Sequence, residues 1–169
     1  RLLEPGFPCL AEDHVTVSTS GVLPGLQRFL REGRGLLALS LNGTTDEQRE
    51  RLIPHTRTWP IGDLLEALRE DQRRGLGRRY GIGYVLWAGV NDGDEDARRL
   101  VRLLDGLSAH VNLIPHNPYT GSELRPPSEE RLLRFQALVR EGGVRCLIRR
   151  PRGQDIAAAC GQLAGKARA

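Results

Sequence analysis

Short apolar runs alternate with longer amphipathic segments along this chain of 169 residues. The short runs are rich in Val, Ile and Leu and are typical of strands buried on both faces of a parallel sheet. The longer segments repeat their apolar residues every three or four positions, as helices do when they cover one face of a sheet. The pattern predicts strands over residues 15–20, 36–41, 80–87, 111–114 and 144–148.

Helices are predicted in the gaps between these strands. Pro24 suits the first turn of a helix, and Gly33, Gly75 and Gly142 suit the residue that follows a last turn. Ser128 is predicted to cap a further helix that has acidic residues in its first turn. The predicted helices span residues 24–32, 46–53, 61–74, 94–107, 129–141 and 155–163.

The order of these elements predicts an α/β fold. Strands that alternate with helices imply parallel strands joined by right-handed crossovers. Five units are too few for a closed eight-fold barrel, so we predict a partial (β/α) barrel. Because the chain begins at Arg1 and not at Met, we expect a fragment whose first strands are missing. Residues 1–14 would lead in from the missing upstream part, and residues 15–169 would form the C-terminal part of the barrel.

Polar residues gather where the predicted strands end. In parallel α/β sheets, functional groups collect at the C-terminal ends of the strands. Hydroxyl, amide and backbone groups there suit the ribose, carboxylate or amino group of a nucleoside-like ligand. Ordinary turn and helix-cap chemistry is the alternative explanation. The polar residues at these ends are Ser18, Ser20, Ser40, Asn42, Asn91, Asp92, Asn117 and residues 150–155.

The chain is basic, with a net charge of +4, a pI of about 9.4 and far more Arg than Lys. The planar guanidinium fork binds phosphate well, so this composition favours a nucleic-acid partner. The codon preference of a GC-rich genome is the other explanation. No apolar run approaches the ~20 residues that cross a membrane, and no signal-peptide pattern opens the chain. We therefore expect a cytoplasmic protein without a membrane partner.

Cysteine chemistry centres on Cys160. Cys9 lies in a terminal segment and Cys146 on a predicted strand, and no CxxC spacing is present to hold zinc or an iron–sulfur cluster. Small residues flank Cys160, so a large ligand could approach its sulfur, and the arginines that precede it would lower a thiol pKa and bind phosphate. A buried helix cysteine packed among alanines is the alternative. The four histidines have no mutual spacing that suggests a metal site.

Several strings occur in one order along the chain: Val-Thr-Val-Ser-Thr-Ser-Gly from residue 15, Ala-Leu-Ser-Leu-Asn from 38, Leu-Ile-Pro from 52, Val-Asn-Asp from 90, Val-Asn-Leu-Ile-Pro-His-Asn-Pro from 111 and Arg-Gly-Gln-Asp-Ile-Ala-Ala-Ala-Cys-Gly-Gln-Leu-Ala-Gly from 152. Together they resemble the radical S-adenosylmethionine (SAM) RNA methyltransferases that methylate adenosine at C2, the RlmN/Cfr type. The resemblance runs from about residue 15 to residue 165. The Ala-Gly ending of the last string, after its Arg-Gly-x-Asp-Ile lead, favours the housekeeping branch that modifies ribosomal RNA (rRNA) and transfer RNA (tRNA).

The resemblance implies that Cys160 is methylated by a first SAM molecule. A second SAM, cleaved at a reduced [4Fe–4S] cluster, would give a radical that takes hydrogen from the methyl group on sulfur. The resulting carbon radical would add to the adenine ring, whose C2 is not nucleophilic and would not accept a polar methyl transfer. The residues implied in SAM contact are Ser18, Ser40 and Asn117, with the backbone around Leu41 and Asn42 beside them.

The chain departs from the family pattern at Asn42, where His is usual, and at Gly83, where the strand usually carries Glu. Gln154 also replaces a common Asp. The CxxxCxxC cluster ligands, the Gly-Glu-Pro motif, the general-base Glu and the resolving Cys belong upstream of this chain. The resemblance therefore implies that the fragment alone is inactive. Its implied partners are RNA and an electron donor for the cluster.

A non-catalytic relative is the alternative function. Such a protein would keep the fold and the basic face but only bind RNA or another partner. The departures at Asn42 and Gly83 keep this alternative open beside the leading enzyme hypothesis, because both lie on the expected cofactor side. Methyl transfer by a Cys160→Ala variant of the full-length protein separates the two functions.

Overall fold

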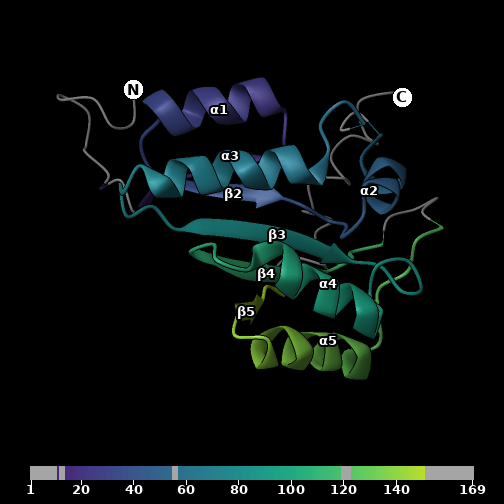
Figure 1. Cartoon of the computed structure of the whole chain (residues 1–169). Coiled ribbons are helices and arrows are strands. Elements are labelled where there is room, and N and C mark those ends of the chain that lie inside the picture. Colours follow the sequence, from purple (N-terminus) through teal and green to yellow (C-terminus); the bar gives the residue numbers. More distant parts are fainter. Residues whose placement is uncertain (1–10, 12–13, 55–56, 119–122, 151–169) are drawn as a thin grey trace.

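The computed structural model describes residues 11, 14–54, 57–118 and 123–150, and all structural statements concern these ranges. Five parallel strands form one sheet in sequential order (Figure 1). The strands are β1 (Thr16–Thr19), β2 (Leu36–Ser40), β3 (Tyr80–Leu86), β4 (Ala109–Pro115) and β5 (Arg145–Ile148). This α/β sheet confirms the predicted fold class.

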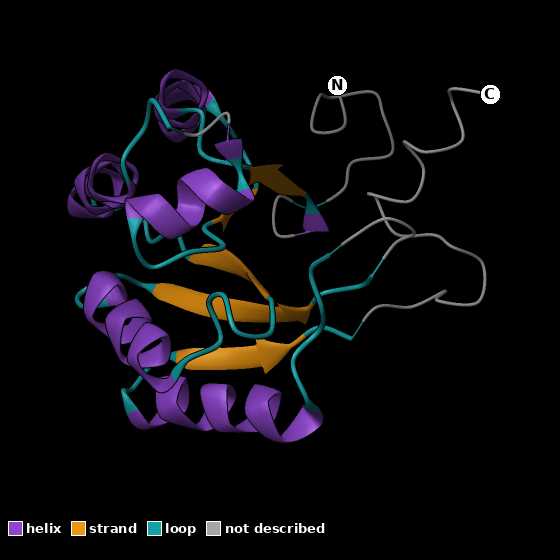
Figure 2. Ribbon diagram, turned by 90° about the vertical axis from the view of Figure 1, so that its right-hand side faces the viewer, coloured by secondary structure: helices purple, strands orange, loops and turns teal. Residues whose placement is uncertain are grey.

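Helices line one side of the sheet, and the opposite face carries none among the described residues (Figure 2). Right-handed crossovers place successive helices on the same side of a sequentially ordered parallel sheet. The short α2 lies beyond the C-terminal end of β2 (Figure 1). The helices are α1 (Leu23–Glu32), α2 (Asp46–Leu52), α3 (Ile61–Arg73), α4 (Asp94–Leu104) and α5 (Glu129–Glu141).

Alternation along the strands gives the sheet two different faces. Leu37, Leu39, Ile82, Val111 and Leu113 point toward the helices and are at most 1% exposed. The residues between them, and their register partners on neighbouring strands, form the other face, which we call the open face. The open face carries Thr16, Ser18, Leu36, Ala38, Ser40, Gly81, Gly83, Val85, His110, Asn112 and Arg145.

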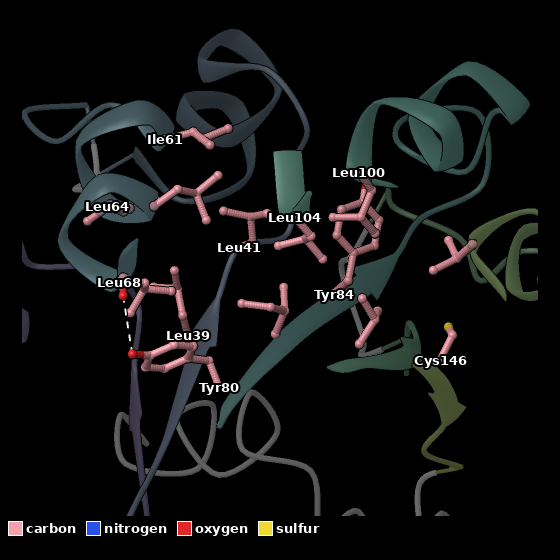
Figure 3. Close-up of a cluster of buried hydrophobic side chains, with 14 of the residues drawn as sticks. Leu39, Leu41, Ile61, Leu64, Leu68, Tyr80, Tyr84, Leu100, Leu104 and Cys146 are labelled. Atoms are coloured by element: carbon pink, nitrogen blue, oxygen red, sulfur yellow. Dashed lines mark hydrogen bonds between the residues drawn. The ribbon is translucent and has the colours of Figure 1, made fainter. Parts of the chain in front are cut away.

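The core lies between the sheet and its helices (Figure 3). Leu64 and Leu68 of α3 pack there with Leu39 of β2, and all three are fully buried. Each buried leucine contributes about 1.5–3 kcal/mol relative to an exposed one. Tyr84 of β3 stacks on Phe135 of α5, with ring centroids 5.5 Å apart. These contacts pack the sheet against its helices.

Two predicted elements, the helix α4 and the strand β4, differ from the structure by more than one residue at one end. The helix α4 ends at Leu104, three residues before the predicted end, because Gly106 turns the chain with a φ of 72°. The strand β4 begins at Ala109, two residues before the predicted start, and continues through Pro115, which pairs in register with Leu86. Proline is tolerated at this strand end because the next residue, His116, supplies the N–H that Leu86 accepts.

The predicted helix over residues 155–163 lies outside the described residues, as do the sequence strings beyond residue 150 and most of residues 1–14. The division of the chain at residue 14 therefore stays a prediction. Among the residues that the structure does describe, no helix is both long enough and apolar enough to cross a membrane.

Candidate cofactor-binding site

Two serine hydroxyls lie on the open face near the C-terminal edge of the sheet. Ser18 of β1 pairs in register with Ala38, and Ser40 follows two residues later on the same face of β2. Ser18 is exposed and Ser40 is half-buried. Neither hydroxyl has a hydrogen bond to another described residue, so both remain available to a ligand.

Gly83 leaves space beside the Ser40 hydroxyl. The two residues are register partners on neighbouring strands. A Cβ atom at Gly83 would lie 3.6 Å from the Ser40 Cα and 3.7 Å from its Oγ, which are ordinary van der Waals distances. Sterics therefore do not require glycine here, and its effect is to leave the open face of β3 without a side chain beside Ser40.

Leu41 and Asn42 form the loop that follows β2, and most of their polar groups are bound within the fold. The Leu41 N–H donates to the Gly83 carbonyl at 2.9 Å, and the Leu41 side chain is fully buried. The Asn42 Oδ1 accepts the Val85 N–H at 2.9 Å. The Leu41 carbonyl already accepts a hydrogen bond from Arg49, so a ligand contact from Leu41 would use the second lone pair of that oxygen. The Asn42 Nδ2, in contrast, has no partner among the described residues.

Asn117 approaches the same edge from β4, two residues after that strand ends at Pro115. It is half-buried, and its side-chain amide is not bonded to another described residue. The neighbouring His116 ring lies 5.8 Å from the Trp87 ring, and burial lowers the pKa of this histidine. The sheet thus brings Ser18, Ser40, Asn42 and Asn117 to one edge from three strands.

Arg49 is a buried cation behind this edge that sequence reasoning missed. It lies on α2, is 1% exposed, and donates from Nη1 to the carbonyls of Ser40 at 2.9 Å and Leu41 at 2.7 Å. Its Nη2 donates to the Ser20 carbonyl, so one guanidinium joins the ends of β1 and β2. Burial lowers the pKa of Arg49, and the nearby Asp46 opposes that shift.

The sequence offered only a weak signal for Arg49. A single arginine within a short charged helix resembles any solvated surface residue, because 25 of the 169 residues are Lys or Arg. Its three carbonyl partners are contributed by residues 20, 40 and 41, which only the tertiary fold brings beneath α2. Nothing in the local pattern separates it from the exposed Arg51 on the same helix.

A basic pocket of about 500 Å³ lies on the open face toward the N-terminal ends of the strands. Its polar lining is Thr16, Arg79, Ser108, His110, Asn112, Arg145 and Arg149, and none of the described residues that line it is acidic. Burial and then the charges of Arg145, Arg149 and Arg79 lower the pKa of His110. The Arg149 Nε donates to the Asn112 Oδ1 at 3.1 Å. The pocket is suited to an anionic group.

The arginines before Cys160 are partly committed to other contacts. Arg150 pairs with Glu129 of α5 at 2.5 Å, and this carboxylate raises the pKa of Arg150.

Cys160 itself lies outside the described residues. Cys146 is fully buried on β5, as predicted, and burial raises its thiol pKa to about 12. No group of three His, Cys, Asp or Glu residues in the described ranges could hold a metal ion.

Solved structures place this fold in a class. A radical SAM methyltransferase from Sphaerobacter thermophilus matches with a TM-score of 0.90 and 44% identity, over 95% of this chain and 47% of that protein. A domain of a pyruvate-formate lyase-activating enzyme from Bacteroides vulgatus shares the fold alone, with a TM-score of 0.62 and 19% identity over 79% of this chain and 80% of that one. The chain has the partial-barrel fold of the radical SAM methyltransferases.

Sequence relatives specify the family. The dual-specificity RNA methyltransferase RlmN 2 of Myxococcus xanthus is 48% identical over 159 residues, which are 94% of this chain and 42% of that protein. The RlmN of Paracoccus denitrificans is 49% identical over 154 residues, which are 91% and 39%. No protein-family model matches the chain. Over more than nine tenths of its length the chain is similar to RlmN-type RNA methyltransferases, and it spans less than half the length of these curated relatives.

Proposed function

We propose that this chain is the C-terminal part of a radical SAM enzyme that methylates adenosine C2 in rRNA or tRNA. The observation that carries the proposal is the gathering of Ser18, Ser40, Asn42 and Asn117 at one sheet edge. Identity of nearly one half to RlmN relatives, across more than nine tenths of the chain, supports the same reaction class.

The side chains at this edge fit SAM as a ligand. Serine hydroxyls both donate and accept, and asparagine amides do the same, so the set matches an amino group, a carboxylate and ribose hydroxyls. Ser18, Ser40, Asn42 and Asn117 would hold the molecule against the open face. Bound SAM supplies a methyl group and, beside a reduced [4Fe–4S] cluster, a radical source. The cluster ligands would be contributed by upstream residues.

Cys160 would serve as the methyl carrier. A thiolate is nucleophilic enough to accept a methyl group in a polar displacement, whereas C2 of adenine is not. Cys146 cannot take this role, because its thiol is fully buried and its pKa of about 12 keeps it protonated near neutral pH. The two cysteines therefore make a matched pair for mutagenesis.

Cys160→Ala in the full-length protein is expected to abolish formation of 2-methyladenosine. The measurement is mass spectrometry of nucleosides from RNA incubated with the protein, SAM and a reductant for the cluster. Cys146→Ala is the control, which we expect to lose stability from a cavity in the core but to retain methylation. Methylation by the Cys160→Ala variant at the wild-type level would show that Cys160 is not the methyl carrier.

Binding of RNA without catalysis is the second candidate function, and the basic pocket favours it. Arg79, Arg145 and Arg149 surround a concave surface that no acidic residue lines in the part of the chain that the structure describes, which suits phosphate groups. A full-length protein that binds RNA but yields no methylated nucleoside with SAM and reductant would support this candidate over the enzyme.

Arg145→Ala is expected to weaken RNA binding several-fold and to make it less salt-dependent, because each lost phosphate contact reduces counterion release. Fluorescence anisotropy with labelled rRNA fragments at several salt concentrations measures both effects. Arg98→Ala is the matched control, since Arg98 is exposed on α4 and is not a pocket residue. Equal loss of affinity in the two variants would argue against the pocket.

A further inference from the structure

The loop after β2 has an unusual backbone. Asn42 has a φ of 59°, and among the described residues it alone adopts positive φ without being glycine. Side chains with a Cβ atom rarely adopt this left-handed conformation, although asparagine tolerates it better than most. Such a conformation persists where surrounding contacts hold it. The contacts that hold Asn42 therefore also set where its side chain and the adjacent Ser40 point.

One buried side chain supplies a central contact of this kind. Asn91, in the turn after β3, is fully buried, and its Nδ2 donates to the Asn42 carbonyl at 2.9 Å. The same Nδ2 donates to the Val85 carbonyl at 2.7 Å, and Oδ1 accepts the Trp87 N–H at 2.8 Å. A single amide thereby ties the end of β3 to a loop that lies 49 residues earlier in the chain.

A second hydrogen bond completes the link in the opposite direction. The Asn42 Oδ1 accepts the Val85 N–H at 2.9 Å, so Val85 is bonded to both asparagines through its two backbone groups. Asn42 is thus fixed at its carbonyl by Asn91 and at its side chain by β3. Its Nδ2 has no partner among the described residues and is the side-chain group left to bind a ligand. Asn91 is fully buried, so it would act on a ligand through the residues that it bonds, Asn42 among them.

We infer that Asn91 is a positioning residue for SAM, acting through Asn42 at the end of β2. The inference rests on the proposed function, since it assumes that the Ser40–Asn42 loop contacts SAM. Without the Nδ2 donor, Asn42 would lose the bond that holds its carbonyl and would leave the left-handed conformation. The cofactor groups of the loop would then be misdirected while the sheet beneath them remained intact.

Asn91→Asp tests this directly, because it preserves size and the acceptor for the Trp87 N–H but removes the donor. In the full-length protein we expect the Kd for SAM, measured by isothermal titration calorimetry, to rise about tenfold or more. The KM for SAM should rise in parallel, with a smaller change in kcat. Asn91→Ser, which is uncharged but too short to reach Asn42, should give the same result if the aspartate variant folds poorly.

Tyr84→Phe is the matched control for general damage to the same turn. The Tyr84 hydroxyl donates to the Asn91 backbone carbonyl at 3.0 Å, so its loss loosens the turn without touching the bond to Asn42. This variant should have a lower Tm but a Kd for SAM within about twofold of wild type. The comparison separates positioning of the cofactor loop from stability.

Three outcomes decide the matter. A raised Kd in the Asn91 variants with a near-normal Kd in Tyr84→Phe supports the positioning role. A wild-type Kd in the Asn91 variants, or an equal rise in Tyr84→Phe at equal loss of Tm, overturns it and leaves Asn91 a structural residue. Failure of the unaltered full-length protein to bind SAM overturns the proposed function itself, and this inference falls with it.

Discussion

At the scale of single residues, two buried polar side chains organise the candidate site without facing it. Arg49 gathers carbonyls from the ends of β1 and β2, and Asn91 gathers groups from the ends of β2 and β3. Each satisfies backbone groups that would otherwise be buried without a partner at strand ends. The Arg49 Nε has no partner among the described residues, so the guanidinium is held chiefly from its two terminal nitrogens.

Arg49→Lys is expected to lower the free energy of unfolding by about 1.5–3 kcal/mol. A lysine keeps the charge but lacks the planar fork that reaches three carbonyls, so charged hydrogen bonds are lost in a buried place. Urea denaturation of the full-length protein measures the change. Arg51→Lys, on the exposed side of the same helix, should remain within about 0.5 kcal/mol of wild type. Equal stability of all three proteins would refute the structural role of Arg49.

At the scale of elements, the two ends of the open face differ in charge. The C-terminal edge carries the neutral groups of Ser18, Ser40 and Asn42, whereas the other end carries the arginines of the basic pocket. His110 on β4 lies within this basic region, 3.4 Å from the Asn112 amide. Burial and three neighbouring arginines disfavour its protonated form and lower its pKa.

This shift predicts a pH dependence of stability. Because the folded-state pKa of His110 lies below that of the unfolded chain, near 6.5, the unfolded chain takes up the proton first as the pH falls. Stability should be highest above about pH 6.5 and should decrease as the pH falls through the lowered folded-state pKa. His110→Gln should flatten part of this slope, with the remainder due in part to His116, whose pKa is also lowered. Thermal unfolding in a pH series tests this, and an unchanged slope would contradict it.

At the scale of the whole molecule, the chain is one sheet with helices on a single side and an open face on the other (Figure 2). The open face carries both the candidate cofactor edge and the basic pocket, which lie toward opposite ends of the strands. Because the chain spans less than half the length of its curated relatives, we propose that upstream parts of the full-length protein complete the site against this face.

The sequence by itself determined the α/β class, the five strands and the resemblance to RlmN-type RNA methyltransferases, because periodicity and the linear strings need no knowledge of distant contacts. The local pattern placed Ser18, Ser40, Asn42 and Asn117 among the polar residues at strand ends, and the family resemblance implied that they contact SAM. The tertiary structure alone decided that Leu41 is bound within the fold, that β4 runs through Pro115, and that the ends of the strands are held by Arg49 and Asn91. Those features depend on hydrogen bonds between residues far apart in sequence, and the chain acquires such partners only when the sheet is assembled.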